Sequence, residues 1–357
     1  MEREIALEMR GVSKYFGSVV ANKNVNLKVY KGEILAVLGE NGSGKTTLMN
    51  MISGIYFPDE GQTFVGGEEA VIRSPQDAFA YKIGMIHQHF KLVDVFTAAQ
   101  NIVLGEKNEP KPVDDKKNAF SKFFAKIGRK MESGLYKKKE VAAQVKEIAD
   151  KYGFEIDPNK KIYNMSVSEK QTVEIVKVLY RGANVLILDE PTAVLTPQET
   201  EKLFAVLRKM KEDGKSIIII THKLNEVLAV SDRVAILRKG ESVGEIATKD
   251  ADENKLTELM VGKKVALNIE RSTPENCEDR LEIKGLNVRS HDGVKVLDNV
   301  SFTAKSGEIL GIAGIAGSGQ KELLEAIAGL QKLESGDMIF HNPKKDKPVT
   351  FFHKDLH

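Results

Sequence analysis

The strongest constraint on the fold is that the amino-terminal part of the sequence occurs twice. Three segments match in the same order, and Gly39 of the first copy corresponds to Gly314, 275 residues further on. The matching pairs are LEMRGV with LEIKGL, KGEILAVLG with SGEILGIAG, and ENGSGKTTLMNMISG with IAGSGQKELLEAIAG. A period of this length is too long for a solenoid repeat and has the size of a duplicated domain.

The repeat predicts two domains of unequal length. The first domain spans residues 1–265 and the second residues 281–357, so the second is less than a third as long as the first. Residues 266–280 between them are polar, contain Pro274 and lack an apolar period, which is typical of a linker. A chain of 357 residues with 41% hydrophobic residues can form a core in each domain.

The charge balance and the cysteine content restrict the class of protein. Lysine and arginine number 53 against 51 acidic residues, so a net charge of +2 argues against wholesale nucleic-acid binding. The single cysteine, Cys277, cannot form an internal disulfide, and the charged amino terminus does not resemble a signal peptide. Apolar runs such as 217–220 are far shorter than the roughly 18 residues that span a bilayer. We therefore expect a cytosolic protein that serves a membrane, if at all, from its cytoplasmic face.

Short apolar runs that alternate with helical segments indicate an α/β fold. β-rich runs come early, a helical middle follows, and VLILDE and SIIIITH then alternate with helices. Continuous apolar runs of this kind are typical of buried parallel strands. Thr196, Pro197 and Glu199 form a capping-box pattern with proline in the first helical position, which predicts a helix from residue 197.

The segment GENGSGKTT, residues 39–47, has the glycine spacing of a phosphate-binding loop between an apolar strand and a helix. Glycines allow the backbone N–H groups to surround a phosphate chain, and Lys45 reaches the terminal phosphates. The Thr46 hydroxyl is a candidate Mg²⁺ ligand. The alternative, a glycine-rich turn with a chance lysine, does not explain the flanking strand and helix.

Polar residues follow two later apolar strands. Asp189 ends the first of them and is a candidate Mg²⁺-organising carboxylate, and Glu190 is a candidate general base for water. His222 follows the second strand. Because ligands of open α/β sheets gather at the carboxyl ends of strands, we expect these side chains near the phosphate loop. The alternatives are solvated acids and an ordinary surface or core histidine.

These motifs, together with KYFG, MIHQHF and MSVSEKQ, resemble the ATP-binding subunits of ABC transporters over the whole chain. The resemblance implies an α/β P-loop NTPase of the ABC-ATPase type, with an antiparallel β subdomain, a helical subdomain and a partial second copy. It implies ATP and Mg²⁺ as cofactors. The nucleotide-binding residues would be Phe16 against adenine and Gly39, Asn41, Gly42, Ser43, Gly44, Lys45, Thr46 and Thr47 around the phosphates. The catalytic residues would be Glu190, His222 and Gln88, and the metal-binding residues would be Thr46, Gln88 and Asp189.

Tandem domains with a degenerate second loop are similar to the importer ATPases for ribose, galactose and nucleosides. The sequences HQHFKLV and EPTAVLTPQE favour the nucleoside branch of this group. The alternative is that the wider sugar group shares both segments, so that they do not distinguish the cargo. The resemblance implies two transmembrane permease subunits and an extracytoplasmic solute-binding protein as partners, no nucleic acid, and a peripheral place on the cytoplasmic face of the membrane. Soluble ABC proteins that act on ribosomes or DNA, and a non-catalytic nucleotide-binding remnant, are competing classes.

The second phosphate loop is defective in its charged residues. Gln320 stands at the position of the loop lysine and Lys321 at that of the Mg²⁺-ligating hydroxyl. In the family resemblance this loop faces the signature segment MSVSEKQ, in which Ser168 replaces the usual glycine. We predict one catalytic site and one structural or weakly binding site; the alternative is slow hydrolysis with Lys321 as a substitute cation. The intact first loop needs a second signature segment, which lies outside this sequence, so either the chain is a fragment or another polypeptide completes the site.

Residues 111–140 are strongly basic and have apolar residues at helical spacing. This pattern predicts a basic amphipathic helix that contacts anionic lipid or a membrane subunit. The alternative is a helix that packs its apolar stripe on its own domain and exposes its basic face to solvent.

Overall fold

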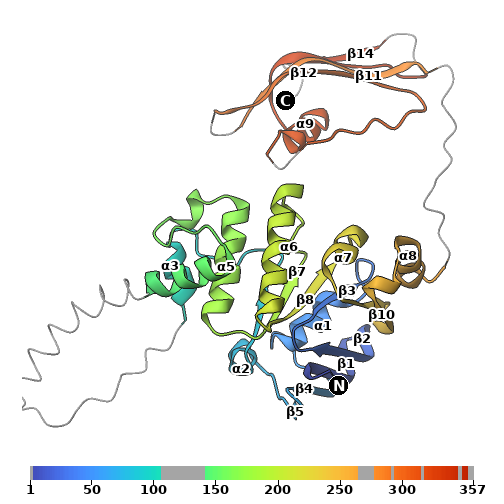
Figure 1. The fold of residues 1–357 in the computed structure, drawn as a ribbon. Helices are drawn as coiled ribbons and strands as arrows, with labels where there is room; N and C mark the ends of the chain where they lie inside the picture. Colours follow the sequence, from blue (N-terminus) through green and yellow to red (C-terminus); the bar gives the residue numbers. More distant parts are fainter. Residues whose placement is uncertain are drawn as a thin grey trace, which may run out of the picture. The chain divides into compact units, whose positions relative to one another are not determined.

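The chain forms two compact units, Met1–Leu267 and Asn268–His357, in the computed structural model (Figure 1). The structure describes residues 3–105, 141–263, 277–290, 293–314, 317–344 and 348–352. The predicted basic helix over 111–140 and most of the predicted linker over 266–280 lie outside the described residues. Each unit is considered by itself below.

A six-stranded sheet forms the centre of the first unit. Its strands follow the order β10 (Glu241–Ala247), β9 (Arg233–Arg238), β3 (Ile34–Leu38), β8 (Ser216–Thr221), β7 (Val185–Asp189) and β6 (Ile83–Ile86). All neighbours run parallel except β9 and β10, which are antiparallel. The carboxyl ends of β3, β7 and β8 therefore lie at one edge of the sheet, the edge at which α/β folds bind ligands.

Helices and a second sheet cover the two faces of this central sheet (Figure 1). Every residue of β3, β7 and β8 is buried, and successive side chains point to opposite faces. Ile217 and Ile219 pack with α5 (Val167–Tyr180) and α6 (Pro197–Glu212), whereas Ile218 and Ile220 share a core with α1 (Lys45–Ile52) and the smaller sheet. The continuous apolar sequence of these strands thus results from burial on both faces.

The smaller sheet of the first unit is antiparallel. Its strand order is β2 (Val19–Tyr30), β1 (Ile5–Phe16), β4 (Glu60–Val65) and β5 (Glu68–Glu69). Phe16 ends β1 and pairs with Val19 across the hairpin. The remaining helices in the described part of this unit are α2 (Pro75–Ala80), α3 (Ala98–Val103), the helical residues 141–152, η1 (Ile162–Asn164), α7 (Leu224–Val230), η2 (Thr248–Asp250) and α8 (Glu253–Val261).

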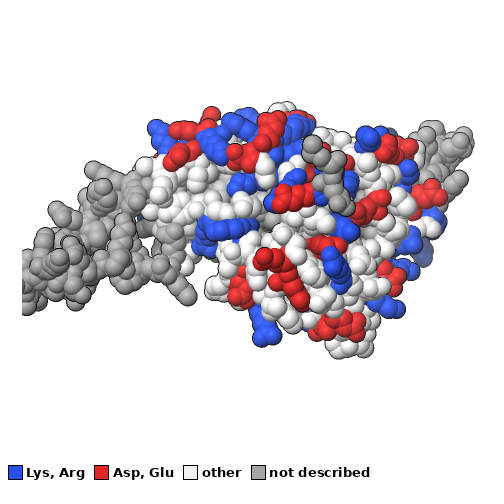
Figure 2. Space-filling view, turned by 60° about the horizontal axis from the view of Figure 1, so that its bottom comes forward, with Lys and Arg blue, Asp and Glu red and all other residues white. Residues whose placement is uncertain are grey.

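The capping box at the start of α6 confirms the helix start predicted from the sequence. The Thr196 hydroxyl accepts from the Glu199 backbone N–H, the Glu199 carboxylate accepts from the Thr196 N–H, and Pro197 is the first helical residue. None of the described helices is both long and apolar enough to cross a bilayer. On the face drawn in Figure 2, lysines and arginines are interspersed with aspartates and glutamates.

The second unit repeats the topology of the small sheet strand for strand. Its order is β12 (Lys295–Lys305), β11 (Asp279–Arg289), β13 (Leu333–Phe340) and β14 (Val349–Phe352), and α9 (Gln320–Ile327) takes the place of α1. The positive φ angle of Asn24, 47°, recurs at Asn299 as 52°. The internal repeat seen in the sequence is therefore also a repeat of the fold.

The expected strand before the second phosphate loop is not present in the described residues 308–314. Ile309, Leu310 and Ile312 are 83%, 44% and 43% exposed, although their counterparts in β3 are fully buried. In the first unit β3 has β8 on one side and β9 on the other. The described part of the second unit contains no such partners for residues 308–314, and a strand needs a neighbour to pair its backbone groups.

This difference predicts where a protease cuts first. Thermolysin should cleave within residues 308–314 at least tenfold faster than within the matching residues 33–39, because exposed backbone with few contacts opens without global unfolding. The products can be mapped by mass spectrometry over a time course. Equal cleavage of the two segments would contradict the exposed conformation of the second copy.

Candidate functional site

The first phosphate loop connects the carboxyl end of β3 to α1. A Cβ atom on Gly39 would lie 2.3 Å from the Leu237 carbonyl oxygen and 2.4 Å from the Ser43 hydroxyl, so the loop passes too closely for a side chain. Gly44 precedes α1 with φ of 93°, a left-handed conformation that favours glycine. The first N–H groups of α1 have no intrahelical partners, and they form an anion-binding end next to Lys45.

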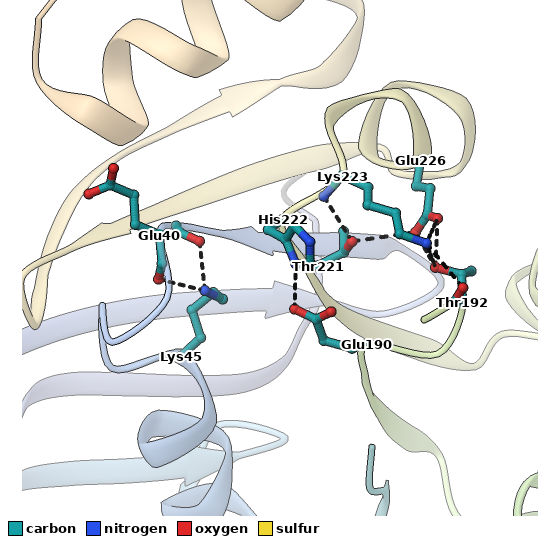
Figure 3. Close-up of polar contacts among 9 residues, drawn as sticks. Glu40, Lys45, Glu190, Thr192, Thr221, His222, Lys223 and Glu226 are labelled. Carbon is teal, nitrogen blue, oxygen red and sulfur yellow. Dashed lines mark hydrogen bonds and ion pairs between the residues drawn. The ribbon is translucent and has the colours of Figure 1, made fainter. Parts of the chain in front are cut away.

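The Lys45 side chain is folded back onto this loop (Figure 3). Its ammonium donates to the carbonyl oxygens of Gly39 and Glu40 at 2.6 and 2.9 Å. Burial lowers the pKa of Lys45, and the nearby carboxylates of Glu190 and Asp189 oppose that shift. A phosphate would therefore replace two neutral acceptors of a buried cation with charged oxygens, which form stronger hydrogen bonds.

Asp189 lies at the end of β7 beside the phosphate loop. Its carboxylate is 5% exposed and accepts a hydrogen bond from the Thr46 hydroxyl. Burial raises the pKa of Asp189, and the Thr46 hydrogen bond acts in the opposite direction. Gln88 lines the same pocket. This set of oxygen donors fits Mg²⁺, which takes one or two protein ligands together with water and phosphate oxygens.

Glu190 and His222 form a contact between the ends of β7 and β8 (Figure 3). The Glu190 Oε1 and His222 Nδ1 atoms are 2.7 Å apart. Glu190 has φ of 48°, and its backbone N–H donates to the Ile220 carbonyl at 2.9 Å. The Glu190 side chain is 15% exposed and that of His222 is 49% exposed, so both reach a surface that opens to solvent.

A pocket of about 540 Å³ collects most of the predicted site residues. Its lining contains eleven of them: Asn41, Gly42, Ser43, Gly44, Lys45, Thr46, Thr47, Gln88, Asp189, Glu190 and His222. The Ser43 hydroxyl is buried and has no hydrogen-bond partner among the described residues, so the loop retains an unused polar group for a ligand. Val19, Val20, Ala21 and Ile220 complete the wall.

Phe16 and Gly39 do not line this pocket. Phe16 is 43% exposed and pairs with Val19, which does line it, so the aromatic ring belongs to a strand end next to the opening. Tyr56 packs edge-on against Phe16 with ring centroids 5.1 Å apart. Tyr56 could not be predicted as a site residue, because it comes from a segment after α1 that carries no motif.

Asn22 is a further residue that the sequence motifs did not identify. Its side chain is fully buried, and its Nδ2 donates to the Gly44 carbonyl at 3.3 Å. The corresponding residue beside the second loop is Leu297. The difference between the two copies was visible in the sequence, and it coincides with the loss of the loop lysine.

We expect Asn22→Leu to weaken ATP binding by the full chain about fivefold, because one hydrogen bond to the loop contributes about 1 kcal/mol. Isothermal titration calorimetry with ATP measures the change. The control is Lys23→Leu on the same strand, whose side chain is exposed and should leave the affinity unchanged. An unaltered affinity in Asn22→Leu would show that this contact does not support the loop.

The signature-like segment starts α5 in the first unit. Ser166 caps the helix, Ser168 lies in its first turn, and the Ser168 side chain hydrogen-bonds with Glu199 of α6. Further along α5, the buried Gln171 amide donates to the Pro191 carbonyl at 2.7 Å. Ser168 does not line the pocket described above.

The second loop holds a neutral side chain where the first holds Lys45. The Gln320 amide donates to the Ile312 carbonyl at 2.9 Å. Lys321 is 78% exposed and pairs with Glu325 at 3.7 Å. In this conformation Lys321 points to a partner on its own helix, so the alternative in which it replaces the loop cation has no support from the geometry.

Comparisons with known proteins find similar chains among transporter components. The ABC transporter family model matches residues 22–193. The chain is 43% identical over 342 residues to the nucleoside import ATP-binding protein NupA of Lactococcus lactis, covering 96% of this chain and 63% of the relative. It is 44% identical to the guanosine import ATP-binding protein NupO of Bacillus subtilis, covering 97% and 64%. It is 42% identical to the glucose import ATP-binding protein TsgD13 of Haloferax volcanii, covering 95% and 62%.

A solved structure supports the fold independently. A nucleotide-free ATP-binding cassette from an ABC transporter matches 72% of this chain and 96% of its own, with a TM-score of 0.58 and 23% identity. The predicted fold class is therefore confirmed. The chain spans slightly less than two thirds of the length of the curated relatives it matches.

Proposed function

We propose that this chain, whose residues 22–193 match the ABC transporter family model, binds and hydrolyses ATP to power the import of a nucleoside through a membrane transporter. The observation that supports this most directly is that residues 41–47 of the first phosphate loop line one pocket together with Gln88, Asp189, Glu190 and His222. Phosphoryl transfer depends mainly on positioning and on charge stabilisation, and these residue types supply both.

In the proposed reaction the phosphate loop and Lys45 hold the terminal phosphates of ATP through N–H groups and one cation. Thr46, Gln88 and Asp189 would hold Mg²⁺, which neutralises charge on the phosphate oxygens when it is bound. Glu190 accepts the proton of the attacking water, and His222 orients the Glu190 carboxylate through their 2.7 Å contact. We assign adenine to Phe16, whose ring is accessible next to the pocket.

A nucleoside is the proposed cargo because NupA and NupO are named as nucleoside and guanosine import ATP-binding proteins. TsgD13, named as a glucose importer, is similar at almost the same identity, so a simple sugar is the alternative cargo. The proposed partners are two permease subunits and an extracytoplasmic solute-binding protein, with this chain at the cytoplasmic face of the membrane. No contact of this chain with the cargo is proposed, and the permease and binding protein would select it.

For the second unit we propose a structural or weakly binding role. Gln320 and Lys321 provide no cation to the loop backbone, as described above. Residues 1–265, 266–280 and 281–357 are proposed as the ATPase domain, the linker and the partial second domain. A non-catalytic nucleotide-binding protein remains the second candidate function, and the defective second loop is the observation that favours it.

The test combines ATP binding, ATP turnover and transport. The full chain should bind Mg-ATP at one site per molecule in calorimetry, and phosphate release should be measured with and without the permease subunits reconstituted in liposomes. Uptake of radiolabelled guanosine against ribose then separates the two cargo classes. Binding without turnover in the reconstituted assembly would favour the non-catalytic candidate, and no binding would reject both.

A further inference from the structure

We propose that Thr192, Lys223 and Glu226 form a positioning cluster that fixes Glu190 against His222 from outside the nucleotide pocket. The proposal deepens the function proposed above, since it concerns the same Glu190 and His222. None of the three residues lines the pocket. They are therefore positioning residues. They act on the reaction only through the loops that they connect, which follow β7 and β8 and carry Glu190 and His222.

The loop after β7, which carries Glu190, needs stabilising contacts because the Glu190 backbone is in an unfavourable conformation. A left-handed φ of 48° places Cβ close to the following carbonyl oxygen, and such a conformation persists only where the surroundings fix it. Besides the Glu190–His222 contact, one backbone hydrogen bond joins the two strand ends here, from the Glu190 N–H to the Ile220 carbonyl. That bond fixes Glu190 at its amide and leaves the segment after it without a backbone bond to β8 in the described residues.

Thr192 anchors the segment after Glu190. It is 2% exposed, and its hydroxyl lies 2.6 Å from each carboxylate oxygen of Glu226, so it donates to that carboxylate. The Lys223 ammonium donates to the Thr192 hydroxyl at 3.1 Å and to the Thr192 carbonyl at 3.0 Å. Thr192 lies two positions after Glu190. Both its side chain and its backbone are thus fixed by Lys223 and Glu226, which follow His222 (Figure 3).

The same two charged residues also fix the segment that carries His222. Lys223 and Glu226 form an ion pair at 3.0 Å. The buried Thr221 hydroxyl accepts from the Lys223 backbone N–H at 3.1 Å and lies 3.4 Å from Glu226 Oε2, to which it donates. His222 therefore lies between Thr221, which contacts the cluster, and Lys223, which belongs to it.

A further contact fixes the segment after Glu190 from another helix. Gln171 of α5 donates to the carbonyl of Pro191, the residue between Glu190 and Thr192. The cluster consequently joins the Glu190 loop to α7, and Gln171 joins it to α5. Since Gln171 would hold the loop even without the cluster, removal of the Thr192 hydroxyl should alter the Glu190–His222 geometry without unfolding the unit.

The experiment measures the NMR signals of the His222 ring in the full chain. Protein labelled with ¹⁵N-histidine gives ring resonances by NMR, and His222→Asn assigns the His222 signals. Thr192→Val should shift or broaden these signals, because the valine keeps the shape of threonine but cannot hydrogen-bond. Thr192→Ser restores the hydroxyl and should restore the wild-type spectrum. Thr257→Val, which removes a similarly buried threonine hydroxyl in α8, is the control and should leave His222 unchanged.

Kinetics of the reconstituted assembly provide the second readout. In Thr192→Val the kcat for ATP should fall about tenfold while KM changes less than twofold, because the phosphate-binding residues are untouched and one charge-assisted hydrogen bond is lost. Thr192→Ser should recover most of the kcat. A parallel fall in thermal stability and in ATP affinity would instead indicate a merely structural role and would overturn the proposal.

The NMR result separates this proposal from the proposed function. If the wild-type assembly shows no turnover, the hydrolysis proposal fails, whereas the His222 signals still decide whether the cluster positions the two loops. Unchanged His222 signals in Thr192→Val and in Glu226→Ala overturn the positioning cluster, whatever the turnover.

Discussion

Lys45→Ala is expected to weaken ATP binding by this chain strongly. Lys45 is the buried cation of the pocket, and within the described part of the chain its ammonium hydrogen-bonds to the Gly39 and Glu40 carbonyls alone. A charge-assisted hydrogen bond to phosphate contributes up to about 3 kcal/mol, so its loss should weaken binding on the order of a hundredfold. Fluorescence titration with a labelled ATP analogue over a thousandfold concentration range measures this loss.

The duplicated loop supplies the matched control for this experiment. Gln320→Ala truncates the residue that corresponds to Lys45 and should leave ATP affinity unchanged if the second loop contributes little binding. The thermal midpoint of the Lys45→Ala protein without nucleotide should stay close to that of the wild type. ATP affinity retained within threefold in Lys45→Ala would mean that the nucleotide does not occupy this loop.

Glu190→Gln is expected to keep ATP binding and to stop turnover. The amide has the shape of the carboxylate, so the contact with His222 can persist, but it cannot accept a proton from water. General-base catalysis typically contributes about 10² to 10⁴ in rate, and kcat should fall by that factor. Phosphate release from the reconstituted assembly, measured beside ATP affinity, separates the two effects.

Glu40→Gln is the control for the loss of a carboxylate near the site. Glu40 is exposed and contacts Lys45 only through its backbone carbonyl, so both kcat and affinity should remain at wild-type values. If Glu190→Gln hydrolyses ATP at the wild-type rate in the complete assembly, Glu190 is not the base. The search for the proton acceptor would then turn to the other polar residues of the pocket.

Local signals in the sequence were sufficient for much of the first unit. The apolar runs at β7 and β8 predicted buried strands, and the Thr196–Glu199 pair predicted the start of α6, because each pattern depends on neighbours along the chain. The glycine spacing of the first loop predicted a strand, a loop and a helix in that order, as the structure has them.

Features that depend on distant residues were not predictable in this way. Residues 308–314 resemble β3 in sequence but do not have its conformation, because a strand forms only where neighbouring strands pair with it. The cluster of Thr192, Lys223 and Glu226 has no motif of its own, since it arises where the ends of two parallel strands meet. Asn22 likewise reaches Gly44 from a strand of the other sheet.

The described glycines of the two phosphate loops have similar conformations, whereas the charges of the loops differ. The φ angles are 80° and 83° at Gly42 and Gly317, and 93° and 87° at Gly44 and Gly319; helices of eight residues follow in both copies. The left-handed glycines and the helix that follows them are thus retained where the lysine is not. For evolution this separates local backbone conformation from charge: one substitution in a duplicated loop removes its cation while the glycines keep their conformation, and one substitution is also the shortest route back.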